Sequence, residues 1–207
     1  MTINYTPDRQ SSFKERVKLE REQEILQAAR DVFSERGFEK ASIDDIAERV
    51  GIGKGTVYLH FPSKEELLLA LMRQSCLRLV EMCRSAATGQ PTTPGKLRCI
   101  IQALVDHRYA NERWVGIVAN ELPVFIGYKQ KLGASSELRA FIAQVLEEGQ
   151  GEGAVDRRVS PAMAASTLLY LIFAAPSADG GEAMPKQALI DAASQLYFHG
   201  ITKEVVK

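Results

Sequence analysis

The side chains best suited to chemistry in this chain lie in residues 51–67, GIGKGTVYLHFPSKEEL. If residues 54–61 form a helix, Val57 and Phe61 stand four apart and can pack inward on one face. A different face carries cationic, phenolic and small groups, at Lys54, Gly55, Tyr58 and Leu59. Ammonium and phenol groups donate hydrogen bonds to phosphates and base edges. The pattern therefore predicts a helix that presents one face to DNA.

The residues before this helix predict a second helix that would hold it in place. Ser42 followed three residues later by Asp45 is a capping signature at a helix N-terminus. Apolar residues then recur at helical spacing, at Ile43, Ile46, Ala47 and Val50. Gly51 stands where a helix end favours positive φ, and Gly53 can begin the next helix after a tight turn. Two helices joined by so short a turn have the geometry of a helix-turn-helix.

The residues after the predicted helix at 54–61 indicate where that helix ends and where a longer helix follows in the sequence. Pro62 ends the first helix, and Ser63 with Glu66 forms another capping box that begins an apolar-periodic helix at about Lys64. The alternating glycines of this region do not form a nucleotide-binding loop, because neither G-x-G-x-x-G nor G-x-x-x-x-G-K-[ST] is present. An ordinary helical bundle that binds nothing stays open as the alternative.

From Glu22 to Leu71 the chain resembles the TetR family of bacterial one-component regulators. The resemblance is carried by a first helix with Ile25, Ala28, Ala29, Val32 and Phe33, by the Gly37-Phe38 stop, by the helix from Ser42 to Val50, and by KGTVYLHF at 54–61 followed by Ser63-Lys64-Glu65. It covers about a quarter of the chain. The C-terminal part resembles the family mainly in length and helical pattern.

The resemblance implies a role for each of eight positions. Those that would contact the sugar-phosphate backbone are Ser42, Tyr58, His60 and Lys64. Those that would approach base edges are Lys54, Gly55, Thr56 and Leu59. Lys54 would donate to guanine, Gly55 would let the helix backbone approach the groove, and Leu59 would touch a thymine methyl. For Tyr58 and His60 the alternative is packing against the third or fourth helix.

Charge does not mark the chain as a general nucleic-acid binder. It has 26 basic and 26 acidic residues, so DNA affinity would depend on local placement. The candidates are Lys54 and Lys64, helix N-termini, and an N-terminal arm, residues 1–19, with Arg9, Lys14, Arg16 and Lys18. The state of the arm is left open between a flexible tail, an extension of the first helix and a minor-groove contact.

Gly- and Pro-containing loops divide the rest of the chain into helices, and no segment alternates convincingly as a strand. The predicted helices cover residues 64–85, 94–110, 113–126, 136–148, 161–175 and 185–200. We therefore predict an all-α fold of about nine helices. Residues 20–66 would form a three-helix DNA-binding head with the helix-turn-helix, and residues 67–207 a larger domain for effector binding and dimerisation.

The last two predicted helices suggest a homodimer. The first of them is apolar on more than one face, with Met163, Leu168, Leu169, Leu171, Ile172 and Phe173, and such a helix needs further packing partners. The family resemblance implies a two-fold interface in which these helices from two copies form a four-helix bundle. Two recognition helices must then reach major grooves about 34–36 Å apart, so we expect a near-palindromic double-stranded DNA operator.

The middle helices would enclose a pocket for a small-molecule effector. Its candidate lining residues are Leu79, Met82, Ile101, Leu104, Trp114, Val118, Glu121, Phe125, Phe141, Tyr170 and Phe173. Apolar stripes at helical spacing more often mark a core than a ligand site, so both interpretations stay open. Glu121 falls among apolar residues, and if buried it needs a partner, either Arg108 or Arg113 or a cationic group on a ligand.

The three cysteines are too few for a disulfide framework, and no Cys/His cluster has the spacing of a metal site. We expect no cofactor and no metal. Cys76 and Cys83 stand seven apart on one predicted helix and cannot bridge each other, which leaves thiol sensing as a remote alternative. No secretory signal or membrane-spanning run is present, so we expect a cytoplasmic location with no membrane partner.

These features predict a sequence-specific transcriptional regulator. We expect a repressor that leaves its operator when a small, mostly apolar effector shifts the long fourth helix. The alternatives are an activator and an architectural DNA binder without an effector. An enzyme is more remote, because the sequence has no nucleophile motif, paired-carboxylate arrangement or metal cluster.

Overall fold

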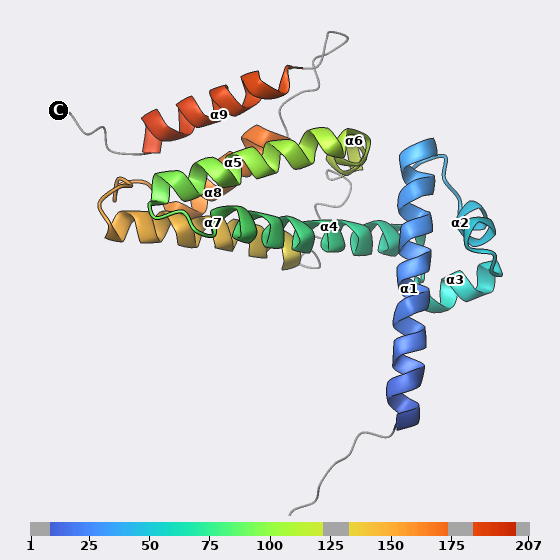
Figure 1. Ribbon diagram of the computed structural model, residues 1–207. Coiled ribbons are helices and arrows are strands. Elements are labelled where there is room, and N and C mark those ends of the chain that lie inside the picture. Colours follow the sequence, from blue (N-terminus) through green and yellow to red (C-terminus); the bar gives the residue numbers. More distant parts are fainter. Residues whose placement is uncertain (1–8, 122–132, 174–183, 202–207) are drawn as a thin grey trace, which may run out of the picture. The chain divides into compact units, whose positions relative to one another are not determined.

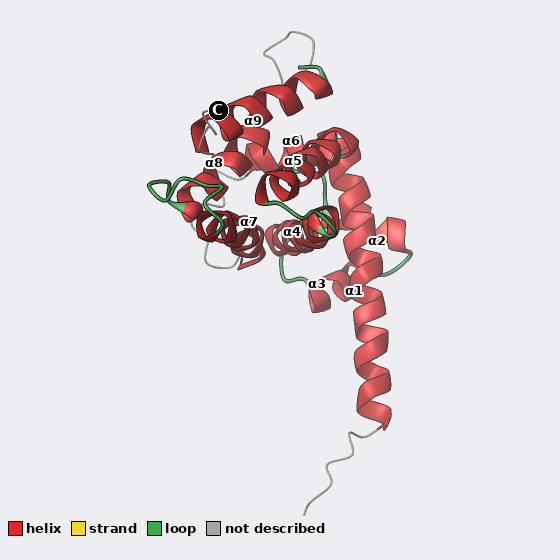
Figure 2. Ribbon diagram, turned by 60° about the vertical axis from the view of Figure 1, so that its left-hand side comes forward, coloured by secondary structure: helices red, strands yellow, loops and turns green. Residues whose placement is uncertain are grey.

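The computed structural model describes residues 9–121, 133–173 and 184–201. Within these ranges the chain forms nine α-helices and no strand (Figure 2). It consists of two compact units that meet in the sequence between Leu71 and Met72. The predicted all-α fold is confirmed. None of the described helices is both long and apolar enough to cross a membrane.

The first unit contains α1 (Arg9–Arg36), α2 (Ile43–Val50), α3 (Lys54–His60) and the start of α4 (Lys64–Ala87). α1 ends at Gly37, which has a φ of 78° and donates its N–H to the carbonyl of Phe33. α2 packs against both α1 and α3, and the N-terminal turns of α1 extend past them (Figure 1).

The turn between α2 and α3 forms as the sequence predicts. Asp45 N donates to Ser42 Oγ over 3.2 Å, and Ser42 N donates to Asp45 Oδ2 over 3.0 Å, which completes the capping box of α2. Gly51 has a φ of 76°, a conformation that favours glycine, and its N–H donates to the carbonyl of Ala47 over 3.0 Å. Gly53 then begins α3 without a side-chain cap.

A small apolar core fixes the orientation of α3. Its fully buried members include Ile25, Ala29, Phe33, Ile46 and Val57. The rings of Phe33 and Phe38 meet edge to face with centroids 5.3 Å apart. Val57 and Phe61, which the sequence predicts to face inward, are both buried. Because one face of α3 is buried, its other face must point outward.

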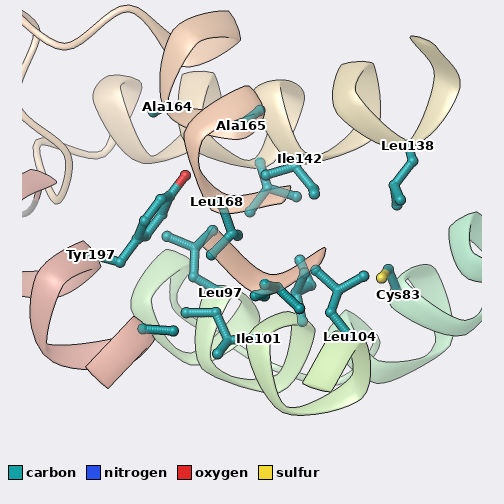
Figure 3. Close-up of a cluster of buried hydrophobic side chains, with 14 of the residues drawn as sticks. Cys83, Leu97, Ile101, Leu104, Leu138, Ile142, Ala164, Ala165, Leu168 and Tyr197 are labelled. Carbon is teal, nitrogen blue, oxygen red and sulfur yellow. The ribbon is translucent and has the colours of Figure 1, made fainter. Parts of the chain in front are cut away.

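The second unit contains the rest of α4 and α5 (Thr93–Ala110), α6 (Glu112–Glu121), α7 (Gly133–Gly151), α8 (Pro161–Phe173) and α9 (Lys186–Ile201). α5 lies in the middle and contacts α6, α7, α8 and α9. Its buried residues, among them Leu97, Ile101 and Leu104, meet Ile142 of α7 and Leu168 of α8 in one core (Figure 3).

The predicted helix bounds agree with the observed ones to within three residues where both are described. The predicted helix at 113–126 is observed as α6 up to Glu121, and its remainder lies outside the described residues. The predicted helix at 161–175 likewise runs to Phe173, the last described residue of that range.

Candidate nucleic-acid interface

The outward face of α3 combines several kinds of side chain. Lys54, Gly55 and Tyr58 are exposed, and Leu59 is 84% exposed. Thr56 is only partly exposed. The face therefore offers an ammonium, a phenol and a branched apolar group, which are the types that contact guanine, phosphate and the thymine methyl.

Gly55 has no internal reason to lack a side chain. A Cβ built on it would meet no atom of the described residues within 4 Å, and its φ is not positive. Glycine inside a helix costs about 1 kcal/mol relative to alanine. By contrast, a Cβ on Gly149 would lie 2.5 Å from Thr93 Cγ2, so internal packing requires that glycine. Packing within the described residues therefore does not require glycine at position 55.

Lys54 is held by a carboxylate of the neighbouring helix. Its Nζ donates to Asp44 Oδ2 over 2.7 Å, which joins the start of α3 to the first turn of α2. This hydrogen bond raises the pKa of Lys54 above its ordinary value. Asp44 could not be predicted as the partner of Lys54 from the sequence, because the pair depends on how the two helices pack.

Lys64 is committed to hydrogen bonds inside the first unit. Its Nζ donates to the carbonyls of Phe38, Glu39 and Ala41 over 2.8, 3.3 and 3.1 Å. It also lies 4.4 Å from the centroid of the Phe38 ring. An ammonium has three N–H donors, and each finds a carbonyl here. The phosphate contact that the resemblance implies for Lys64 would compete with these bonds.

Ser42 likewise has a structural role. Its hydroxyl donates to Asp45 Oδ2 over 2.7 Å and accepts from Asp45 N. The hydrogen bonds that the hydroxyl and the backbone N–H of Ser42 donate to the Asp45 carboxylate hold the pKa of Asp45 below its ordinary value. Asp45 also accepts from Arg36 over 2.6 Å, which ties α2 to the end of α1. Ser42 thus positions α2. The contact with the sugar-phosphate backbone of DNA that the resemblance implies for Ser42 stays a prediction.

His60 packs against α1. Its Nδ1 lies 3.3 Å from Glu22 Oε1, and only 14% of its side chain is exposed. The Nζ of Lys18 lies 3.8 Å from the same carboxylate oxygen. Packing against α1 differs from the alternative considered from the sequence, in which His60 met the third or fourth helix. Its phosphate contact also stays a prediction.

The residues predicted to line an effector pocket fall into three groups. Leu79, Ile101, Leu104 and Trp114 are buried. Met82, Val118, Phe141 and Phe173 are partly buried. Tyr170 is 76% exposed on the single chain, while Phe125 and the side chain of Glu121 lie outside the described residues. The burial of Leu79, Ile101, Leu104 and Trp114 agrees with core packing, the alternative that the sequence left open. The ligand-binding roles of all these residues stay predictions.

Polar contacts tie the helices of the second unit together. Trp114 Nε1, in α6, donates to Ser75 Oγ of α4 over 3.1 Å. The Arg108 guanidinium, in α5, donates to the carbonyl of Ile172 near the end of α8. Trp114 is the single tryptophan of the chain, so its fluorescence reports on the contact between α4 and α6.

The two cysteines of α4 are poorly suited to thiol chemistry. Burial raises the pKa of the Cys76 thiol to about 11 and that of the Cys83 thiol to about 12. The thiolate is the reactive form of cysteine, so both thiols stay protonated near neutral pH. This disfavours thiol sensing.

An open apolar groove of about 450 Å³ lies between α8 and α9. Its lining residues are Val159, Ser160, Met163, Ala164, Thr167, Leu168, Leu171, Leu196 and Tyr197. Met163 and Leu196 are 68% and 64% exposed. The Tyr197 hydroxyl is buried and has no hydrogen-bond partner among the described residues. Figure 3 shows this side chain reaching from α9 toward α8, and its burial raises the pKa of Tyr197.

The fold and this geometry define a class of protein. A short turn joins α2 to α3, the buried Val57 orients α3 so that its donor-bearing face meets solvent, and a larger helical unit follows. That is the arrangement of a helix-turn-helix DNA-binding protein. The family described as bacterial regulatory proteins, tetR family, matches residues 25–71.

The similarity extends beyond the head. The HTH-type transcriptional regulator UidR of Escherichia coli is 31% identical over 154 residues, which cover 72% of this chain and 76% of UidR. The chain belongs to the tetR family of bacterial regulatory proteins, as its sequence motifs predict.

Other similarities cover different shares of the chain. The HTH-type transcriptional activator FasR of Mycolicibacterium smegmatis is 38% identical over 87 residues, so the chain spans only 40% of that relative; these residues are 42% of this chain. The transcriptional regulator FadR of Bacillus subtilis, in complex with stearoyl-CoA, has a TM-score of 0.74 at 21% identity, over 86% of this chain and 98% of FadR. The second similarity shows a shared fold.

Proposed function

We propose that this protein is a repressor that binds a specific DNA operator through α3 and leaves it when a small, mostly apolar molecule binds the second unit. The observation that carries the proposal is the outward face of α3, where Lys54, Tyr58 and Leu59 surround a glycine with no internal packing role. Such a surface suits a major groove, where donors meet guanine and apolar groups meet thymine.

A homodimer through α8 and α9 is the second part of the proposal. The groove between these helices and its exposed apolar residues support it, because large apolar side chains gathered on one face favour a protein partner. A two-fold pair would place two α3 helices about 34–36 Å apart on a near-palindromic operator.

Release by an effector would act through α4. This helix begins in the first unit at Lys64 and ends in the second at Ala87. Within the second unit, Trp114 of α6 is hydrogen-bonded to Ser75 of α4, so a ligand that moves α6 would also act on α4. A ligand that prefers the DNA-incompetent state shifts the population toward it, by linkage.

The effector class is proposed as apolar because the predicted pocket residues are apolar. The FadR structure contains stearoyl-CoA, which makes that compound a suitable first probe. Relatives are named both as activators and as repressors. We propose repression, because it needs only occupancy of the operator. We further propose that the protein acts in the cytoplasm, where its DNA is found, and that it has no catalytic activity.

The proposal is tested by selecting random DNA duplexes with the purified protein at physiological salt and sequencing the bound pool. A palindromic consensus with half-sites about one helical turn apart, or a small multiple of it, is expected. A pool with no enriched sequence would contradict specific DNA binding. Transcription from a promoter that carries the consensus should fall when the protein is added, and a rise would identify an activator.

Stearoyl-CoA then tests release. Its binding should change Trp114 fluorescence and lower the affinity for the selected operator. Saturation of the protein by this compound without any loss of DNA affinity would exclude it as the effector.

A further inference from the structure

One ion pair beside the outward face of α3 contributes little to the fold. Lys54 Nζ lies 2.7 Å from Asp44 Oδ2, and the two side chains are 49% and 66% exposed. Exposed pairs of this kind add little to the free energy of folding. Asp44 stands in the first turn of α2 and Lys54 begins α3, so each helix of the helix-turn-helix supplies one member.

The pair presents a hydrogen-bond donor beside an acceptor. Of the three ammonium N–H groups of Lys54, one is directed at Asp44. A carboxylate can accept several hydrogen bonds at once. Both groups can therefore bind further partners while they stay bonded to each other, with 2.7 Å between Lys54 Nζ and Asp44 Oδ2.

The major-groove edge of a G·C pair has the complementary arrangement. Guanine offers its N7 and O6 as acceptors, and cytosine offers its N4 amino group as a donor. O6 and N4 of one base pair are hydrogen-bonded to each other, so they lie about 2.9 Å apart. The spacing and polarity of the Lys54–Asp44 pair match those of O6 and N4.

Other base pairs match less well. A T·A pair keeps an acceptor beside a donor, but the thymine methyl stands where guanine N7 would be. One N–H of Lys54 then has no acceptor. In the C·G and A·T orientations the order of donor and acceptor is reversed, so that the carboxylate would face an acceptor.

We propose that Lys54 and Asp44 read one G·C pair as a unit, with Lys54 donating to guanine O6 and N7 and Asp44 accepting from cytosine N4. The proposal rests on the proposed function of α3 in operator binding. It adds Asp44, on α2, to the base-reading residues that the family resemblance implies, all of which lie on α3.

The carboxylate has a second effect. Binding to DNA of any sequence depends on neutralising phosphates, and a negative charge beside Lys54 opposes it. Asp44 therefore lowers the affinity for DNA that offers no G·C pair at this position, while it strengthens the contact with DNA that does.

The test measures binding of the full chain to the selected operator and to three duplexes in which the G·C pair assigned to Lys54 is replaced. Lys54→Ala identifies that pair by relaxing selection there. Asp44→Ala should lower the preference for G·C over the other pairs by at least about fivefold, near the lower end of what a base contact contributes. It should also raise the affinity for random DNA. Asp44→Asn, which keeps an acceptor oxygen, should retain most of the preference.

The double variant and a control complete the design. In the Lys54→Ala background, Asp44→Ala should change the base preference no further, since the two act as a unit. Glu48→Ala removes an exposed carboxylate from the same helix α2 and should leave the preference unchanged. Circular dichroism of each variant verifies folding.

Two outcomes overturn the inference. Asp44→Ala could strengthen binding to every duplex equally, which would make Asp44 only a charge beside Lys54. The wild type could also select an operator with no G·C preference that depends on Lys54. In both cases the proposed function stands, because an operator is still selected. Failure of the proposed function has a different signature, since the wild-type protein would then select no sequence at all.

Discussion

The outward face of α3 and the groove between α8 and α9 are both surfaces that the single chain leaves open, yet they differ in chemistry. At α3 the ammonium of Lys54 has a partner in the carboxylate of Asp44, and just beyond it, at the start of α4, Lys64 donates to three backbone carbonyls. In the α8–α9 groove the surface is mainly apolar, and the buried Tyr197 hydroxyl has no partner among the described residues.

The difference indicates what each surface binds. A polar face whose groups are already oriented suits a charged and hydrated partner, because little ordering is needed when it binds. An open apolar groove suits a protein partner that removes apolar area from water. The outward face of α3 would select the DNA sequence. The α8–α9 groove, as a dimer interface, would set the distance between the two half-sites that the dimer contacts.

The largest effect is expected from a charge placed in the groove. Leu196→Glu should give a monomer in sedimentation velocity, because a carboxylate would be buried against the partner's apolar side chains. Operator affinity should fall by about 100-fold or more, since two linked half-sites bind with far higher avidity than one. Gln195→Glu adds the same charge at an exposed neighbour that does not line the groove, and it should remain dimeric. A dimeric Leu196→Glu protein would assign the interface elsewhere.

The next largest effect is expected at Gly55, where one substitution should change the stability of the fold and the affinity for DNA in opposite directions. Gly55→Ala should raise the free energy of unfolding by up to about 1 kcal/mol, because the added methyl meets no atom in the part of the chain that the structure describes. Operator affinity should nevertheless fall by roughly tenfold, which is about 1.4 kcal/mol, because the methyl would hold α3 away from the groove. Gly116→Ala in α6, where a Cβ also meets nothing, should not weaken DNA binding. Unchanged operator affinity of Gly55→Ala would show that the backbone of α3 does not approach the DNA groove closely at this position.

A third prediction concerns the hydrogen bonds that Lys64 donates to backbone carbonyls of the first unit. Lys64→Ala should lower the free energy of unfolding by about 1–3 kcal/mol in urea denaturation, because the carbonyls that it satisfies lose a charged donor. Lys40→Ala, at an exposed lysine of the same unit, should change it by less than about 0.5 kcal/mol. If Lys64→Ala left stability unchanged and lowered the salt dependence of DNA binding instead, Lys64 would be the phosphate contact that the family resemblance implies.

The smallest expected effect concerns the buried phenol. Tyr197→Phe removes a hydroxyl that has no partner within the described chain, so in a monomeric Leu196→Glu background stability should be unchanged or higher by about 1 kcal/mol. In the dimer the same substitution should weaken association if the partner supplies the missing hydrogen bond. Equal effects in both backgrounds would show that the hydroxyl plays no part in the interface.

Local rules explain why so much of the first unit could be predicted from the sequence. The Ser42–Asp45 cap and the positive φ of Gly51 involve residues no more than a few positions apart, and their chemistry is nearly independent of the rest of the fold. The inward positions Val57 and Phe61 follow from helical spacing alone.

The contacts that could not be predicted from the sequence are long-range ones. Lys64 reaches carbonyls more than twenty positions earlier, and His60 meets Glu22 across 38 positions. Which side chains meet at such separations depends on how the helices pack. In the second unit the pattern predicted apolar faces correctly, but it could not tell a core position such as Ile101 from a pocket wall, since both are apolar at the same spacing.

In the proposed dimer, an interface formed by α8 and α9 holds two α3 faces at one fixed distance on DNA. This arrangement is tested most directly by measuring affinity for the selected operator before and after five base pairs are inserted between its half-sites, which turns one half-site by about half a helical turn. The affinity is expected to fall to that of a single half-site. Unchanged affinity would contradict this arrangement, because the two chains would then bind independently.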